Sequence, residues 1–165
     1  PFAVLVANTP TAPKPMAELI STVKNKPQSF ASAGVGTMTH LGSELVMRKA
    51  GMQATHIPYK GSGAALTDLM GGQVLFATDS LTAAMTHIRS GRLRALATTD
   101  AAREASLPDV PTLAESGLPG LQVAAIGGLF APKGTPKEVV DKVADATRKV
   151  LANPEVQALL PLLRT

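Results

Sequence analysis

The sequence predicts an α/β fold in which a mostly parallel sheet is flanked by helices. Short apolar segments alternate with segments whose apolar residues recur every three or four positions, as strands alternate with amphipathic helices. The 165 residues include four Phe, one Tyr and no Trp, so the core must come from aliphatic side chains and Met, which suits helices packed on a parallel sheet. A chain of this length can form one ordinary domain.

The first part of the chain predicts a strand, a helix and a second strand. Residues Phe2 to Ala7 are a continuous apolar run typical of a buried strand, and a group of prolines follows it. A helix is expected from about Met16 to Lys24. Residues Gln28 to Ala31, after the breaker Pro27, are expected to form the next strand.

The segment 32–40, with the sequence SAGVGTMTH, stands where this second strand gives way to a helix. Gly34 and Gly36 can adopt positive φ or bring bare backbone close to a ligand. Thr37 and Thr39 add hydroxyl donors, and the first N–H groups of the helix have no partner within it. Such a turn suits a carboxylate or phosphate at the positive end of the helix dipole. A plain tight turn is the alternative interpretation of these glycines.

The helix that follows this glycine cradle, residues 32–39, is expected to stop at Gly51. One face should pack on the core, and its residues recur at helical spacing: Met38, Leu41, Leu45 and Val46.

The middle of the chain repeats the order of strand, turn and helix. A strand at Thr55 to Pro58 leads into a second glycine-rich turn, YKGSG, and a helix. A strand at Val74 to Ala77 leads into a Thr78-Asp79-Ser80 turn and another helix. A further strand at Leu93 to Thr98 precedes a long connection broken by proline and glycine.

The last part of the chain predicts one more strand and two helices. The strand is expected from Leu121 to Ala131, interrupted by two glycines. The sequence TPKE at 135–138 combines a capping box with proline at the first helical position, which predicts a helix to about Leu151. A short helix should begin at Pro154. The longer helix is expected to place its valines inward: Val139, Val140, Val143 and Val150.

Three strand-to-helix turns follow the carboxyl ends of neighbouring strands, so they should meet at one edge of this sheet. Ligands of parallel sheets bind at this edge, beyond the carboxyl ends of the strands. Asp79 could cap the helix that begins at Ser80, or contact a ligand amine or hydroxyl. The candidate ligand-binding residues are Ser32, Ala33, Gly34, Gly36, Thr37, Thr39, Tyr59, Asp79 and Ser80.

The familiar nucleotide and catalytic motifs do not fit. A dinucleotide fingerprint needs a third glycine at position 39, which is Thr39, and an acid about twenty residues on, where the chain has Ala54, Thr55 and His56. No Gly-x-Ser-x-Gly elbow, HExxH or CxxC pattern occurs, so catalysis, a metal and a cofactor are not expected. His40 and Glu44 lie one turn apart, but a structural role is expected for His40.

Composition narrows the class of partner. The net charge of +4 favours anions, yet the basic residues are scattered and few aromatics are present, so no nucleic-acid binding is expected. No apolar run reaches the length of a membrane span. The absence of Cys leaves the compartment open.

Several segments of the chain strongly resemble the Bug family, the periplasmic solute-binding proteins of tripartite tricarboxylate transporters, in order and spacing. The segments are FASAGVGTMTHL (30–41), HIPYKGS (56–62), LTDLMGGQV (66–74), HIRSGRLRALA (87–97), LPDVPT (107–112), AESG (114–117) and LFAPKGTP (129–136). The resemblance covers nearly the whole chain.

The resemblance implies a type II periplasmic binding-protein fold, in which two α/β domains joined by crossover strands close on a small carboxylate-bearing ligand. The glycine cradle would hold part of the carboxylate. The chain would be the second domain, with crossover strands near Phe2–Ala7 and 127–131, without the N-terminal domain and the C-terminal stretch. The expected partners are a small organic anion, either a carboxylate or an acidic amino acid, and the membrane subunits of the transporter. The expected location is the periplasm.

Two further hypotheses remain open at this point. The cradle could hold a phosphate in a doubly wound enzyme, or the chain could be the effector or sensor domain of a regulator, since the same fold serves that role. An acid such as Asp79 facing a cleft would repel a second carboxylate, and would favour a ligand with an amine or hydroxyl there.

Overall fold

The computed structural model describes residues 3–8, 15–123 and 129–159. The chain forms two compact units, residues 1–125 and 126–165, and each is described by itself.

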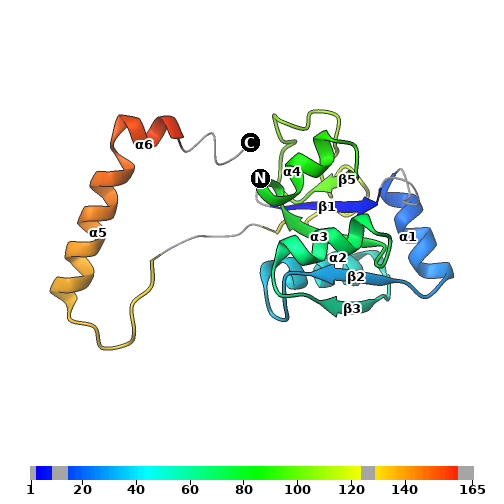
Figure 1. Ribbon diagram of the computed structural model, residues 1–165, viewed down its shortest axis with the longest axis horizontal. Helices are drawn as coiled ribbons and strands as arrows, with labels where there is room; N and C mark the ends of the chain where they lie inside the picture. The colour runs from blue at the N-terminus through cyan, green and yellow to red at the C-terminus, as the bar shows by residue number, and fades with distance from the viewer. Residues whose placement is uncertain (1–2, 9–14, 124–128, 160–165) are drawn as a thin grey trace. The chain divides into compact units, whose positions relative to one another are not determined.

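The first unit is built on a five-stranded sheet with the order β3-β2-β4-β1-β5 (Figure 1). Its strands are β1 (Ala3–Asn8), β2 (Ser29–Ser32), β3 (Thr55–Pro58), β4 (Phe76–Ser80) and β5 (Leu93–Thr98). β2 pairs in parallel with β3 and β4, whereas β1 lies between β4 and β5 and is antiparallel to both. The predicted mostly parallel sheet is therefore confirmed, with the first strand of the chain inserted in the opposite direction.

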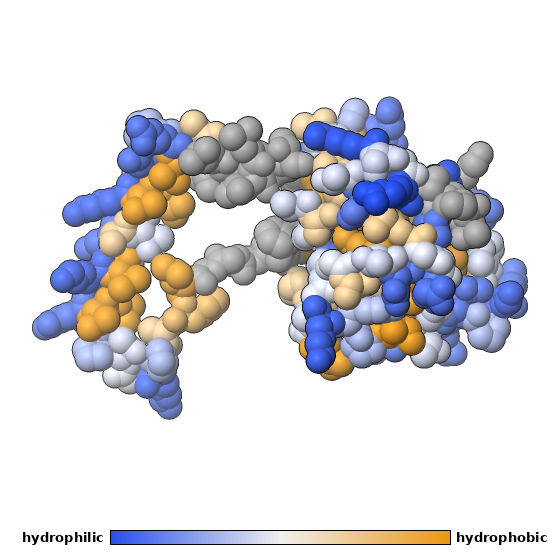
Figure 2. Space-filling view, viewed as in Figure 1, coloured by the Kyte–Doolittle hydropathy of each residue, from blue (hydrophilic) through white to orange (hydrophobic). Residues whose placement is uncertain are grey.

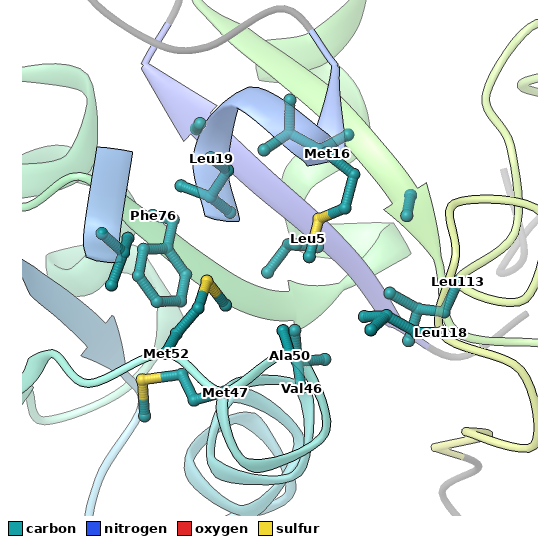
Figure 3. Close-up of a cluster of buried hydrophobic side chains, with 14 of the residues drawn as sticks. Leu5, Met16, Leu19, Val46, Met47, Ala50, Met52, Phe76, Leu113 and Leu118 are labelled. Carbon is teal, nitrogen blue, oxygen red and sulfur yellow. The ribbon is translucent and has the colours of Figure 1, made fainter. Parts of the chain in front are cut away.

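Four helices cover the two faces of this sheet, and the alternating side chains of β1 show which helices lie on each face. The helices are α1 (Met16–Asn25), α2 (Met38–Ala50), α3 (Ser62–Met70) and α4 (Leu81–Arg89). Leu5 packs in a core cluster with residues of α1 and α2 (Figure 3). Its neighbours Val4 and Val6 pack in a second cluster with residues of α3 and α4. A strand buried on both faces explains the continuous apolar run in β1.

The buried face of α2 differs from the predicted one. Met38, Leu41 and Leu45 are between 43% and 46% exposed. The face toward the sheet is built instead from Gly42, Ser43, Val46, Met47 and Ala50. Small residues allow α2 to approach β4 closely, since a Cβ added at Gly42 would lie 3.2 Å from the Thr78 side chain. Val46 is buried as predicted, but an apolar periodicity does not register glycine and serine, so Met38, Leu41 and Leu45 were placed on the wrong face.

β4 extends further than predicted. Residues Thr78, Asp79 and Ser80 were expected in a turn, but they pair with β1 and belong to the strand. Ser80, rather than Asp79, is the N-cap of α4, and its hydroxyl accepts from the N–H of Ala83 at 3.2 Å. Pairing with a strand far away in sequence overrides the local turn preference of these polar residues.

The strand expected from Leu121 to Ala131 is not found in the parts of it that are described. Residues 121–123 and 129–131 adopt no strand conformation, and 124–128 lie outside the described residues. Val123 is hydrogen-bonded to Thr99 alone among the described residues: its N–H donates to the Thr99 carbonyl at 3.1 Å and its carbonyl accepts from the Thr99 hydroxyl at 2.8 Å, whereas a strand needs a continuous ladder. A second crossover strand near 127–131 stays a prediction.

The second unit contains α5 (Lys137–Leu151) and α6 (Pro154–Leu159). The predicted capping box is not formed, because the Thr135 hydroxyl donates to the carbonyl of Pro132 at 2.8 Å and Pro136 is the N-cap. The valines predicted to face inward are between 43% and 56% exposed. Figure 2 shows these apolar side chains along one side of α5. A unit this small offers too little apolar surface to cover them.

Candidate functional site

The three segments predicted as turns lie at one edge of the sheet, the third of them as the end of β4, and hydrogen bonds tie them together. The N–H of Tyr59 donates to the carbonyl of Ser32 at 3.0 Å, and the N–H of Gly61 donates to the carbonyl of Ala33 at 3.1 Å. The turn after β3 is thereby fixed to the cradle after β2. The start of α3 is joined in turn to the end of β4, where the Ser62 hydroxyl donates to Asp79. The starts of α2, α3 and α4 thus form one connected surface.

The cradle has a backbone shape that its glycines make possible. Gly34 has φ 141° and Gly36 has φ 76°, both in the region that side chains with a Cβ rarely adopt. A Cβ at Gly34 would lie 3.5 Å from the carbonyl oxygen of Tyr59, whereas Gly36 has nothing within 4 Å. The open space at Gly36 leaves the outer side of the cradle accessible.

The hydroxyl groups of the cradle are occupied in holding its shape. Thr39 Oγ1 accepts from the N–H of Ala33 at 2.8 Å and lies 2.8 Å from Thr37 Oγ1. Thr37 Oγ1 donates to the carbonyl of Gly34 at 2.7 Å and accepts from the N–H of His40 at 3.3 Å as the N-cap of α2. Thr37 and Thr39 were expected to donate to a ligand, but their hydroxyls have partners within the protein.

The groups left for a ligand are backbone N–H groups. Within the described part of the chain, those of Val35, Met38 and Thr39 have no hydrogen-bond acceptor. They precede or open the first turn of α2, where the helix dipole adds positive potential. Val35 and Met38 were not among the predicted site residues, because an apolar side chain gives no sign that its own N–H group is free.

Asp79 is completely buried at the end of β4. Its Oδ1 accepts from the Ser62 hydroxyl at 2.6 Å and from the N–H of Ser80 at 2.7 Å. Its Oδ2 is also buried and has no hydrogen-bond partner among the described residues. Burial raises the pKa of this carboxyl, and the bonds from Ser62 and Ser80 act in the opposite direction. A covered carboxylate ties α3 to α4, and its contact with a ligand stays a prediction.

Tyr59 and Ser80 also use their hydroxyls within the protein. The Tyr59 hydroxyl donates to Oδ2 of Asp68 at 2.8 Å, and Ser80 caps α4. Burial, followed by the bond to Asp68, raises the pKa of Tyr59. The backbone of Tyr59 borders the cradle, whereas its hydroxyl is directed to α3.

Two histidines support the cradle; a structural role was expected for His40, whereas none was predicted for His56. Nδ1 of His40 accepts from the N–H of Gly36 at 3.1 Å, and Nε2 of His56 lies 2.7 Å from the Ser32 hydroxyl. Their rings stack with centroids 3.9 Å apart. Burial, together with the charge of His40, lowers the pKa of His56, while Glu44 opposes the shift. Within the described residues, no cluster of His, Cys, Asp and Glu could hold a metal ion.

Comparison with known proteins supplies the family. The tripartite tricarboxylate transporter family receptor, TctC, matches residues 1–162. The chain belongs to this family. It is 40% identical over 164 residues to the UPF0065 protein in the tcbD-tcbE intergenic region of Pseudomonas sp. strain P51, covering 98% of this chain and 49% of the relative. The chain therefore spans about half the length of this curated relative.

Solved structures of TctC-like receptors have the same fold. MatC of Rhodopseudomonas palustris with bound malate is 35% identical, with a TM-score of 0.89 over 98% of this chain and 56% of MatC. The periplasmic binding protein BugD is 37% identical, with a TM-score of 0.87 over 98% of this chain and 55% of BugD. The predicted Bug-family fold is confirmed, and these relatives are solute-binding receptors rather than enzymes. Across the described residues, no helix has the length and apolarity needed to cross a membrane.

Proposed function

We propose that this chain is the second α/β domain of a two-domain receptor that captures a small carboxylate-bearing solute for a tripartite tricarboxylate transporter. The observation that carries the proposal is the set of free N–H groups of Val35, Met38 and Thr39 at the start of α2. These donors are already held in place by the glycines and hydroxyls of the cradle, so binding a carboxylate costs little ordering of the chain.

The chemistry of the cradle suits an anion better than a neutral solute. Hydrogen bonds from N–H groups to a charged acceptor contribute about 1.5–3 kcal/mol each, more than bonds between neutral groups. The helix dipole adds to this preference at the first turn of α2. Membership of a family that includes MatC with malate supports a carboxylate over a phosphate. The receptor would work in the periplasm and deliver its solute to the membrane subunits of the transporter.

The other half of the site would come from a domain that this chain does not contain. The free donors lie on one surface, and a binding protein encloses its ligand between two domains that close on it. The half-exposed valines of α5 support this proposal, because an exposed apolar helix face marks a surface that packs on further structure. On this proposal the 165-residue chain alone binds a carboxylate weakly.

Calorimetry tests the proposal on the receptor encoded by the whole gene. The solutes are malate, succinate, glutamate, an aromatic acid and inorganic phosphate, with the neutral diamide of malate as the matched control. We expect saturable binding of at least one carboxylate and none of the diamide. Heat with phosphate alone would favour the enzyme alternative, and no heat with any carboxylate would overturn the proposal.

A further inference from the structure

We propose that His40 and His56 are positioning residues that hold the glycine cradle in its anion-binding shape, His40 only while its Nδ1 carries no proton, so that solute capture weakens as the pH falls. The inference rests on the proposed function, because it concerns the same cradle. Neither imidazole is proposed to touch the solute.

His40 fixes the outer part of the cradle through a bond that depends on its protonation state. Nδ1 of His40 accepts from the N–H of Gly36 at 3.1 Å, which requires a nitrogen without a proton. A protonated imidazole carries a proton on both nitrogens, so the N–H of Gly36 would then face a second donor. Gly36 has positive φ and no atom within 4 Å of the point where a Cβ would lie, so few other contacts restrain it.

His56 supports the inner part of the cradle through Ser32. Its Nε2 lies 2.7 Å from the Ser32 hydroxyl, which itself accepts from the N–H of Gly34 at 3.1 Å. The hydroxyl donates its one proton to the carbonyl of Gly34 at 3.1 Å, so it accepts from the Nε2–H of His56, a bond that a further proton on Nδ1 of His56 leaves in place. The imidazole therefore orients the hydroxyl that closes the backbone around Gly34.

The stacking of the two rings links these supports. His40 and His56 stack with centroids 3.9 Å apart, and Phe30 stacks on His56 at 4.9 Å. Two imidazolium cations at this distance would repel each other, so the pair takes up a first proton far more easily than a second.

The charged groups around the pair determine the direction of the effect. Burial and His40 disfavour a charge on His56, and Glu44 favours it. Glu44 Oε1 lies 3.8 Å from Nε2 of His40 but is half exposed, so water screens its influence. This environment favours the neutral ring of His56.

The sign of the pH dependence follows. The folded protein disfavours a proton on His56 relative to the unfolded chain, so the stability that His56 contributes is present above the ordinary histidine range and is lost as the pH falls below it. A cation near the cradle would also attract a carboxylate, which acts in the opposite direction. We infer that loss of the Gly36 bond dominates, because the free N–H groups bind only in the shape that this bond holds.

The first test needs no ligand. Amide hydrogen exchange of the 165-residue chain, followed by NMR from pH 7.5 to 5.5, should show the protection factor of Gly36 falling about tenfold while that of Gly61 stays within twofold. His40→Asn retains an acceptor that does not titrate and should keep Gly36 protected throughout. His87→Asn, at the third histidine, is the matched control and should behave as the wild type. Unchanged protection of Gly36 in the wild type would overturn the proposal.

The second test measures malate binding by the whole receptor with calorimetry from about pH 7.5 to 5.5. Carboxylic acids take up most of their protons below this pH range. We expect the wild-type affinity to fall about fivefold to tenfold, as for the loss of one hydrogen bond, and that of His40→Asn to change less than twofold. An affinity that rises at pH 5.5, or an equally steep fall in His40→Asn, would contradict the proposal. If no carboxylate binds at any pH, the proposed function fails, and the exchange of Gly36 still decides the role of the histidines.

Discussion

The hydroxyl of Ser62 donates to Oδ1 of Asp79 across 2.6 Å and joins the start of α3 to the end of β4. Asp79 is completely buried, and its only other bond among the described residues is from the N–H of Ser80. Ser62→Ala should lower the free energy of unfolding by about 1–3 kcal/mol, because a buried carboxyl loses one of two donors. Thermal and denaturant unfolding measure this, with Thr67→Ala on the exposed side of α3 as the control. Equal stabilities of the two variants would contradict the prediction.

Asp79→Asn should change how stability depends on pH. Burial raises the pKa of the carboxyl, so the folded protein keeps this proton to a higher pH than the unfolded chain. Stability contributed by Asp79 is therefore lost as the pH rises through the folded-state pKa. The uncharged amide has no such dependence, so the stability of Asp79→Asn relative to the wild type should increase from pH 4 to pH 7. A difference that stays constant across denaturant titrations at these pH values would show that the carboxyl does not titrate as described.

Gly36→Ala should destabilise the cradle through the backbone alone. Gly36 has φ 76° and open space where a Cβ would lie, so no clash contributes. A residue with a Cβ in this conformation costs about 1–2 kcal/mol. Carboxylate affinity should fall as well, because the neighbouring Val35 N–H would move. Gly63→Ala is the control: Gly63 also has open space but lies in α3 without positive φ, so the change should be neutral or stabilising by up to about 1 kcal/mol.

Ser43→Ala should loosen the contact between α2 and β4. The buried Ser43 hydroxyl lies 3.0 Å from the Thr78 hydroxyl and accepts from the N–H of Thr78 at 3.2 Å. Removing it leaves buried polar groups of Thr78 with fewer partners, which should cost about 1–3 kcal/mol in unfolding experiments. Ser21→Ala, at an exposed serine of α1, removes a similar hydroxyl and should cost much less. A comparable loss at both positions would contradict the role of Ser43.

The architecture was predictable because its signals are local. The alternation of apolar strands with amphipathic helices predicted β1 to β5 and all six described helices, although the strand expected at 121–131 is absent from the described residues of that range. The positions of Gly34 and Gly36 predicted a turn with unusual backbone angles, which the structure confirms. The position of β1 was not predictable, since nothing in its own sequence indicates insertion between β4 and β5. That insertion also placed Asp79 in a strand rather than a turn.

The details of the site depended on contacts between distant segments. His56 lies 24 residues from Ser32, and only the parallel pairing of β2 with β3 brings them together. The hydroxyls of the cradle were expected to be ligand donors, whereas each finds a partner that only the folded backbone supplies. The free donors are backbone N–H groups, and the side chains of Val35 and Met38 do not indicate whether the N–H groups of these residues have acceptors.

Tyr59→Phe distinguishes a ligand-binding tyrosine from a structural one. The Tyr59 hydroxyl donates to Asp68 at 2.8 Å, within the same segment of turn and helix. Its loss should lower stability by about 0.5–1.5 kcal/mol, the usual contribution of one hydrogen bond. Carboxylate affinity of the whole receptor should stay within twofold, because the cradle is tied to Tyr59 through its backbone N–H, which phenylalanine retains. Calorimetry measures the carboxylate affinity of Tyr59→Phe and of the control Asp68→Asn, which keeps an acceptor for the Tyr59 hydroxyl. A fall in affinity of more than tenfold in Tyr59→Phe alone would mean that the hydroxyl leaves Asp68 and binds the solute.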